Sequence, residues 1–230
     1  MYDPTSGWLQ QAEGYGGFDL ASAYDPTTRR VFVFGGMLSI YDVESDTWTL
    51  DNNFGFPPLW PRYAGAYDLT GVVDSRRGLF WAVGGFCRPA GGSSCEGTVF
   101  VWDIARNAAV TGDWVTTGAG FYSNRDHLQG YEDQAFESGG STIYYANAPG
   151  FDYDSRADDL VAWPNSGAPY ALDLDTKEWT LGGDVGAPVA QNAGGTFGRW
   201  RYVSAYNVFI LVNSVDENVY FYKHTSGCCP

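Results

Sequence analysis

Short runs of apolar and aromatic residues, broken by Gly, Pro, Asn or Asp, extend along this whole chain. The clearest group begins with residues 18–23, continues through residues 30–34 and 38–42, and ends with residues 47–50. Runs of this length that are rich in β-branched and aromatic side chains and bounded by turn residues are typical of β-strands. The pattern therefore predicts an all-β protein made of short strands.

The same group of strands recurs along the chain. Residues 40–48 read IYDVESDTW and residues 171–179 read ALDLDTKEW, and in both a Trp follows the first Asp by six residues. A looser copy begins at Val101. Self-similarity at a period of tens of residues indicates a repeat architecture such as a solenoid or a propeller. We predict one all-β domain, residues 1–230, with repeats at about 18–62, 63–118, 119–183 and 184–225.

The last three repeats are predicted to supply strands of the same kind. They lie at residues 63–68, 79–85, 98–104 and 114–116, then at 142–147, 159–163, 169–174 and 179–181, and finally at 198–203, 208–213 and 218–223.

The fourth repeat has no final Trp-bearing strand, whereas the chain opens with an isolated one at residues 7–10. In a closed ring the N-terminal strand completes the last blade and hides the edges that an open array exposes. We therefore expect a β-propeller of about four four-stranded blades, with residues 7–10 beside the strand at 218–223. A piece of a larger ring would give the same pattern and stays open as an alternative.

Two of the repeats carry a recognisable motif. Val33–Gly36 (VFGG), followed by an aromatic-Asp hairpin and Trp48, resembles the kelch repeat, and Val83–Gly85 (VGG) resembles it again. The resemblance covers most of the chain. In the third and fourth repeats, Trp163–Asn165 (WPN) and Val212–Ser214 (VNS) replace the double Gly.

This resemblance implies a kelch-type propeller. The class includes protein-interaction rings, galactose-oxidase-like copper enzymes and some secreted polysaccharide lyases. The copper enzymes use two His and Tyr ligands on the ring face, and this chain has only His127 and the tail residue His224. We therefore expect no copper site, and we assign the kelch Gly and Trp residues structural roles.

The charge of the chain limits its partners. The formal net charge is -14, from 27 acidic and 13 basic residues. Because phosphate binding needs clustered Lys and Arg, nucleic acid and anionic membranes are excluded as main partners. No run approaches the ~18 continuous apolar residues that span a bilayer, so no membrane insertion is expected.

The four Cys residues form two close pairs. Cys87 and Cys95 bracket a Gly- and Ser-rich loop, and Cys228 and Cys229 are adjacent near the end. Neither pair has the second CxxC or the His partners of a zinc site. We predict a disulfide between Cys87 and Cys95, which implies an extracellular protein, and the pairing of the terminal Cys residues stays open. No signal peptide precedes the first repeat, as in a mature or truncated secreted protein.

In a propeller, the connections between second and third strands and those between blades share one face. The long insertions of this chain fall on that face, which we call the long-loop face: residues 51–61, 87–95, 119–140 and 183–196. Binding residues concentrate on loops held by a rigid scaffold. The opposite, short-turn face carries tight turns whose Asp residues we interpret as turn formers.

Candidate ligand-binding residues gather on the long-loop face. The longest insertion combines a His, an Arg, carboxylates and Tyr residues within residues 121–134, and two predicted inner strands begin with Arg beside an aromatic residue. Guanidinium groups suit carboxylate or sulfate, and aromatic rings give flat surfaces for sugars. The predicted ligand-binding residues are Arg62, Tyr63, Arg88, Tyr122, Arg125, Glu132, Trp200 and Tyr202.

We expect a secreted module that binds or assembles with a glycan or a protein through the long-loop face. The alternative is a lyase acting on an acidic, uronate-containing polysaccharide. That reaction removes a proton next to a carboxylate, so it needs a charge neutraliser, here Arg199 or Arg201, and an acid and a base, here His127 and Tyr131. No spacing motif ties these residues together, and the sequence leaves open whether the chain is an enzyme.

No cofactor is expected. Calcium is the one alternative, because it takes several oxygen ligands and Asp152–Asp154 with Asp158 and Asp159 is the richest acidic cluster. The cluster lacks the Gly-bearing loop of an EF-hand and is predicted to lie in a turn. Completion of the ring by further chains also stays open.

Overall fold

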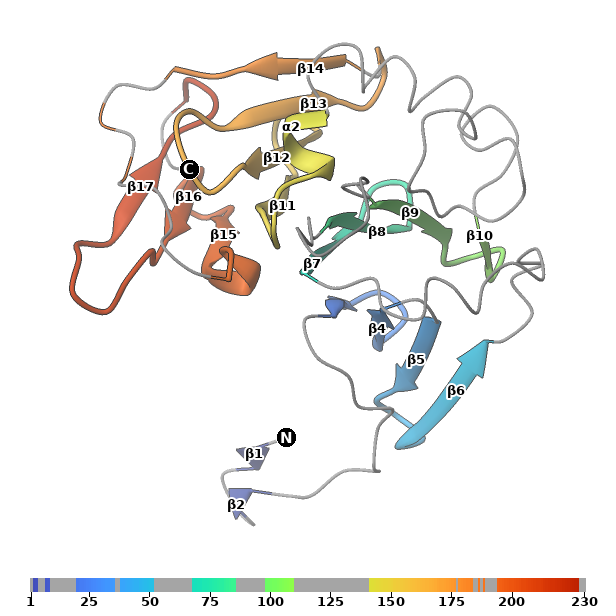
Figure 1. Ribbon diagram of the computed structural model, residues 1–230. Helices are drawn as coiled ribbons and strands as arrows, with labels where there is room; N and C mark the ends of the chain where they lie inside the picture. Colours follow the sequence, from blue (N-terminus) through green and yellow to red (C-terminus); the bar gives the residue numbers. More distant parts are fainter. Residues whose placement is uncertain are drawn as a thin grey trace, which may run out of the picture.

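The computed structural model is an all-β fold in which four antiparallel sheets of three or four strands follow one another along an arc (Figure 1). The structure describes residues 2–3, 7–8, 20–35, 38–51, 68–85, 98–109, 141–176, 178–183, 186, 188 and 194–227. In each sheet the strands lie in sequence order, with the first strand innermost in the arc and the last outermost (Figure 1). The predicted all-β class is confirmed.

The sheets correspond to the four repeats of the sequence. Sheet one is β3 (Ala21–Asp25), β4 (Arg30–Phe34), β5 (Leu38–Asp42) and β6 (Thr47–Asp51). Sheet two is β7 (Leu69–Asp74), β8 (Leu79–Gly84), β9 (Thr98–Asp103) and β10 (Ala108–Ala109). Sheet three is β11 (Gly150–Asp154), β12 (Asp159–Trp163), β13 (Tyr170–Asp173) and β14 (Glu178–Leu181). Sheet four is β15 (Trp200–Val203), β16 (Val208–Leu211) and β17 (Tyr220–Tyr222).

Helical structure is limited to short turns in the described part of the chain. The helix α2 (Ser141–Tyr144) precedes sheet three, and the 3-10 helix η4 (Phe197–Arg199) leads into sheet four. Among the described helices none has the length and apolar character needed to cross a membrane.

A buried Asp shapes the first hairpin of three sheets. Each first strand is joined to the second by a four-residue turn. In sheet one the carboxylate of Asp25 accepts hydrogen bonds from the backbone N–H groups of Thr27 and Thr28, both at 3.1 Å. The last turn residue, Arg29, has a φ of 56°. An Asp side chain that mimics a backbone turn favours this geometry, so the hairpin is encoded locally. The equivalent buried residues are Asp74 and Asp154.

The turns between third and fourth strands use the same device. Oδ1 of Asp173 accepts hydrogen bonds from the backbone N–H groups of Asp175 and Thr176, both at 2.8 Å. The hydrogen bond from Thr176 is the main reason why the pKa of Asp173 is lowered. Asp42 and Asp103 act in the same way. Asp42, Asp103 and Asp173 are therefore the turn formers of these connections, and Asp46 and Asp175, which we interpreted as turn formers from the sequence, bind Tyr41 and Arg77 instead.

Apolar side chains fill the space between successive sheets. Between sheets one and two, the rings of Phe34 and Phe100 stack with centroids 4.0 Å apart. Between sheets three and four, Trp163, Trp200 and Phe209 are buried in one cluster. A cluster that includes Trp81 and Trp179 lies between sheets two and three. Burial of side chains of this size contributes about 1.5–3 kcal/mol each, so these clusters hold the sheets together.

The inner strands approach one another closely. β3 packs against β7, β7 against β11, and β11 against β15. A Cβ atom on Gly71 of β7 would lie 3.0 Å from the backbone nitrogen of Ser22 in β3. A Cβ atom on Gly150 of β11 would lie 2.8 Å from the Cβ atom of Trp200 in β15. These two positions therefore require glycine because of the neighbouring sheet.

The inner strands of sheets two and three are not the ones predicted. In sheet two the inner strand is β7, the apolar run that ends at the turn-forming Asp74, and residues 63–67 of the predicted strand lie outside the described residues. Residues 142–147 include helix α2 and not a strand. The helical turn lets the adjacent side chains of Ile143 and Tyr144 both reach the core, whereas a strand would direct them to opposite faces. The inner strand of sheet three is β11 instead.

The predicted closing strand pairs elsewhere in the structure. Gly7 pairs with Asp3 and Trp8 with Tyr2, so that β1 (Tyr2–Asp3) and β2 (Gly7–Trp8) form their own two-stranded ribbon. The described part of sheet four ends at β17. A local hairpin closes a far shorter loop than pairing with β17 does, so its entropic cost is lower. The outer strand of sheet two was predicted at residues 114–116, which lie outside the described residues. In the structure β10 pairs with β9 as the outermost described strand of this sheet.

The close approach at Gly150 gives a test. Replacing Gly150 by Val should lower the free energy of unfolding by roughly 1–3 kcal/mol, because the added side chain overlaps Trp200 and separates the inner strands. Urea unfolding monitored by Trp fluorescence measures this change. Gly183→Ala is the control, because a Cβ atom on Gly183 meets no atom within 4 Å. Equal midpoints for both variants would contradict the packing described.

Candidate functional site

The described part of the long-loop face is a hydrogen-bonded rim where the chain enters each inner strand. Asp68, Ala148 and Phe197 occupy equivalent positions in the second, third and fourth repeats. All three have a left-handed backbone, with φ of 58°, 34° and 51°. Such a backbone costs roughly 1–3 kcal/mol for a non-glycine residue, so surrounding contacts must hold it in place.

Backbone hydrogen bonds join these three positions into one rim. The N–H of Ala148 donates to the carbonyl oxygen of Asp68 at 2.6 Å. The carbonyl oxygen of Ala148 accepts from the N–H groups of Thr196 and Phe197 at 2.8 and 2.9 Å. The rim therefore links sheets two, three and four at their inner ends.

Asn165 completes the rim from the side. It stands where the first two repeats have Gly36 and Gly85, and its own φ is 70°. Its side-chain nitrogen donates to the carbonyl oxygen of Asn147 at 2.6 Å, and its Oδ1 accepts from the hydroxyl of Thr196 at 2.6 Å. The loss of the double Gly in the third repeat was the sequence signal for this residue, which our sequence analysis did not assign to the site.

Arg199 also holds the rim. It lies in η4 and not in the strand predicted at residues 198–203, so it does not share a strand face with Arg201. Its guanidinium donates to the carbonyl oxygens of Thr196 at 3.0 Å and Asn213 at 2.8 Å, and also to that of Gly195. Three of its N–H groups are thus used in ordering the loop.

The other three predicted residues in sheet four have different environments. Arg201 is half exposed, and its Nη1 lies 3.9 Å from Oδ2 of Asp152 in β11. Burial is the main cause that raises the pKa of Asp152, which also accepts the backbone N–H of Tyr202 at 2.8 Å. Trp200 is buried in the core, and the hydroxyl of Tyr202 donates to Oδ1 of Asn207 at 2.9 Å. Of the three, Arg201 alone offers a charged group to solvent.

The remaining predicted site residues lie outside the described residues. They are Arg62, Tyr63, Arg88, Tyr122, Arg125, His127, Tyr131 and Glu132, together with the predicted disulfide partners Cys87 and Cys95. Their assignments stay predictions.

Two grooves meet at Gly182 and Gly183, directly after β14. One has a volume of about 490 Å³ and lies between sheet three and the outer strand of sheet four. Its lining includes Ala171, Thr180, Phe221, Tyr222, Lys223 and His224. The other has a volume of about 460 Å³, and its lining includes Thr142, Pro164, Ser166, Tyr170 and Leu181. The connection that they share belongs to the long-loop face.

The predicted calcium cluster is dispersed by the sheet. Asp152 faces sheet four, Asp154 caps its own turn, and Asp158 points toward sheet two. Oδ2 of Asp159 lies 2.8 Å from Nε2 of His224. Among the described residues, no three His, Cys, Asp or Glu side chains gather to hold a metal ion. His224, which the sequence placed in a tail, thus connects sheets three and four.

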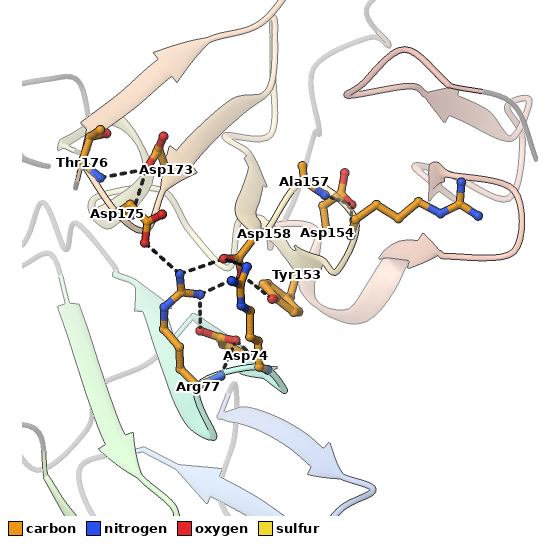
Figure 2. A network of polar contacts seen from close by, with 11 residues as sticks. Asp74, Arg77, Tyr153, Asp154, Ala157, Asp158, Asp173, Asp175 and Thr176 are labelled. Atoms are coloured by element: carbon orange, nitrogen blue, oxygen red, sulfur yellow. Dashed lines mark hydrogen bonds and ion pairs between the residues drawn. The ribbon is translucent and has the colours of Figure 1, made fainter.

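Arg77 is the centre of a polar network on the short-turn face (Figure 2). Its guanidinium binds Asp158 with two hydrogen bonds of 2.8 and 2.9 Å. It also contacts Asp74 at 3.1 Å and Asp175 at 3.3 Å, and the hydroxyl of Tyr153 donates to Asp158 at 2.5 Å. The network joins the first hairpin of sheet two to two turns of sheet three (Figure 2). It is an inter-sheet clamp, since its acceptors are already occupied.

The clamp fixes the charge states of its members. Burial acts to raise the pKa of Asp158, but the hydrogen bonds from Arg77 and Tyr153 outweigh it, so the net effect is a lowered pKa. The hydrogen bond to Asp158 raises the pKa of Arg77. Asp158 therefore remains ionised at neutral pH.

Comparisons with known proteins do not identify a family. No protein-family model and no curated protein sequence matches the chain. A solved structure of U3-55K is similar with a TM-score of 0.39 and 9% identity, over 93% of this chain and 55% of that chain. The chain thus spans about half the length of that structure, and a likeness this distant supports no statement about function.

The clamp predicts a pH-dependent stability. A lowered pKa means that ionised Asp158 stabilises the fold above its unfolded-state pKa, and that this contribution is lost as the pH falls through the folded-state pKa. Arg77→Met should cost on the order of 3 kcal/mol at pH 7 and less at pH 2. Urea unfolding at the two pH values measures the difference. Arg29→Met, which breaks the exposed pair with Glu44, should cost less than about 1 kcal/mol at both. A loss of equal size at both pH values would contradict the role of Asp158.

Proposed function

We propose that this chain is a secreted kelch-like propeller that binds a glycan on its long-loop face, in the two grooves that meet at Gly182 and Gly183. The observation that carries the proposal is the composition of these grooves. Tyr170 and Tyr222 supply aromatic surfaces, and Thr180 and His224 supply polar groups beside them. Aromatic rings next to hydrogen-bonding groups suit sugars, and both volumes fall in the roughly 300–1,000 Å³ range of ligand sites.

The propeller assignment is part of the same proposal. Equivalent positions pack in the same way from one sheet to the next, as the blades of a propeller do. The position beside β17, on the outer side of sheet four, is where a fourth strand of the last blade would lie.

A binding function is favoured over the lyase alternative because of the environments of the candidate charge neutralisers. Arg199, one of the two candidate charge neutralisers, uses three of its N–H groups on backbone carbonyl oxygens. Arg201 keeps a half-exposed guanidinium beside Asp152, which is a suitable contact for a sugar hydroxyl or carboxylate. The acid and base of the lyase hypothesis, His127 and Tyr131, lie outside the described residues.

Filling the shared end of the two grooves tests this function. Gly183→Trp should abolish binding to an array of neutral and uronate-containing oligosaccharides, because the indole would occupy space that both grooves use. A Cβ atom at this position meets no neighbour within 4 Å, so the fold should be retained. Thermal unfolding of the unliganded variant checks that point.

The control is Ser45→Trp, which adds the same side chain to an exposed turn of sheet one. It should bind like the wild type. Uronate substrates that gain the absorbance of an unsaturated product would instead support the lyase. If the wild type binds no glycan and a protein partner is captured whose binding Gly183→Trp leaves unchanged, the proposed site is wrong.

A further inference from the structure

Sheet four has one buried face and one exposed face. Tyr202, Phe209 and Tyr222 lie in one row across the sheet and pack toward sheet three. The neighbouring row, Arg201, Ile210 and Phe221, lies on the other face. Phe221 is 67% exposed, and Ile210 is half-buried. Further apolar residues of the same face are Val203, Val208, Val212 and Val219.

Sheet one has the opposite asymmetry. Phe32 and Phe34 are buried against sheet two. Tyr24 and Val31 pair across β3 and β4 on the other face, with Tyr24 50% exposed and Val31 half-buried. Val33 continues this face and is also half-buried. The two end sheets of the arc thus each present an apolar face outward.

In the two inner sheets the equivalent apolar faces are buried against neighbouring sheets. Every residue of β7 and β8 in sheet two is buried, because one face packs on sheet one and the other on sheet three. An apolar face that is buried in the middle of the array is exposed at its ends. Exposed apolar faces of this kind mark interaction surfaces.

Equivalent positions in the second strand of each sheet indicate which faces can pack against one another. Phe32 in sheet one corresponds to Trp81 in sheet two, to Val161 in sheet three and to Ile210 in sheet four. In the first three sheets this position packs on the following sheet. Ile210 holds the same position in the last sheet, and its face is therefore shaped to receive a following sheet.

The converse holds for the first sheet. Val31 corresponds to Phe80, Leu160 and Phe209, which pack on the preceding sheet in every case. The outward face of sheet one therefore has the form that packs against a preceding sheet. The outward face of sheet four and the outward face of sheet one therefore have the forms needed to pack against each other, as the facing sides of successive sheets do.

We infer that two copies of this chain associate head to tail, with the Tyr24 face of one copy packed against the Phe221 face of the other. Two such contacts related by a twofold axis would close a ring of eight sheets, which is within the range of four to eight blades known for propellers. The half-exposed Arg201 and the exposed Lys223 belong to the Phe221 face, and they would meet a partner copy whose net charge is -14. This assembly extends the proposed function without depending on it.

A second copy is better suited to cover the Phe221 face of sheet four than the chain's own first sheet. Successive inner strands pack on one another from β3 to β15, but β15 does not pack on β3 in the described structure as its neighbours do. Figure 1 shows sheets one and four at opposite ends of the arc. Closing four sheets on themselves would require each inter-sheet contact to change, whereas a second copy uses the contacts as they are.

The test is the solution mass of matched variants by light scattering after size exclusion. The wild type should run as a dimer at micromolar concentration. Tyr24→Asp and Phe221→Asp should each raise the dissociation constant at least tenfold, because each places a charge in the contact. Leu181→Asp changes a residue that is 63% exposed and lies on neither face, and it should leave the mass unchanged.

Mixing the variants separates head-to-tail association from every other arrangement. A mixture of Tyr24→Asp and Phe221→Asp retains one unaltered contact, between the Tyr24 face of one variant and the Phe221 face of the other. Dimer should therefore reappear in the mixture and not in either variant alone. Circular dichroism of each variant confirms that the fold is retained.

Three results would overturn the inference. The wild type could stay monomeric at high concentration, which would favour closure of the ring within one chain. A dimer that both Asp variants leave intact would place the contact on another surface. A failure of the mixture to restore the dimer would exclude a head-to-tail contact. Glycan binding is measured separately, with the Gly183→Trp variant, so that the two proposals can fail independently.

Discussion

The close lateral packing of the inner strands is the constraint on which the rest of this structure depends. β3, β7, β11 and β15 approach so closely that Gly71 and Gly150 have no room for a side chain. Because the inner strands are close and the sheets diverge outward, large aromatic residues are needed to fill the widening space. This accounts for the many Trp, Tyr and Phe residues and for their concentration in strands.

The same constraint shapes the candidate site. A chain that returns from the outside of one sheet to the inside of the next must turn sharply before the inner strand. It does so through left-handed residues at three equivalent positions, which are held by the hydrogen bonds of the rim. Arg199 and Asn165 contribute to this rim and not to a freely accessible surface. The grooves that meet at Gly182 and Gly183 lie next to this ordered rim, and the rim can therefore fix the geometry of their walls.

A repeat array of this kind stabilises each sheet through its neighbours, so the two end sheets differ from the inner ones for a purely geometrical reason. The Arg77 clamp, the His224 contact and the aromatic clusters all act between successive sheets. At the ends of the arc the same positions carry the same kinds of residues, but their apolar faces are exposed. The association proposed above follows from this repetition.

The sequence by itself determined the elements that depend on local chemistry. β4, β5 and β12 were predicted residue by residue, because each is a short run rich in β-branched and aromatic residues that follows or precedes a turn set by an Asp. The repeats and the all-β class were also accessible, since β-branched and aromatic runs between turn residues have few other ways to fold.

Tertiary structure decided what depends on neighbours far along the chain. The inner strands of sheets two and three could not be placed from composition, because the decisive contacts come from the adjacent sheet. For the same reason the sequence did not show that the guanidinium of Arg199, a candidate charge neutraliser of the lyase alternative, is held by three carbonyl oxygens. The acidic cluster at residues 152–159 is the clearest example. Its members are close in sequence, but Asp152 lies in β11 and Asp158 in the turn that follows, and they contact opposite neighbouring sheets.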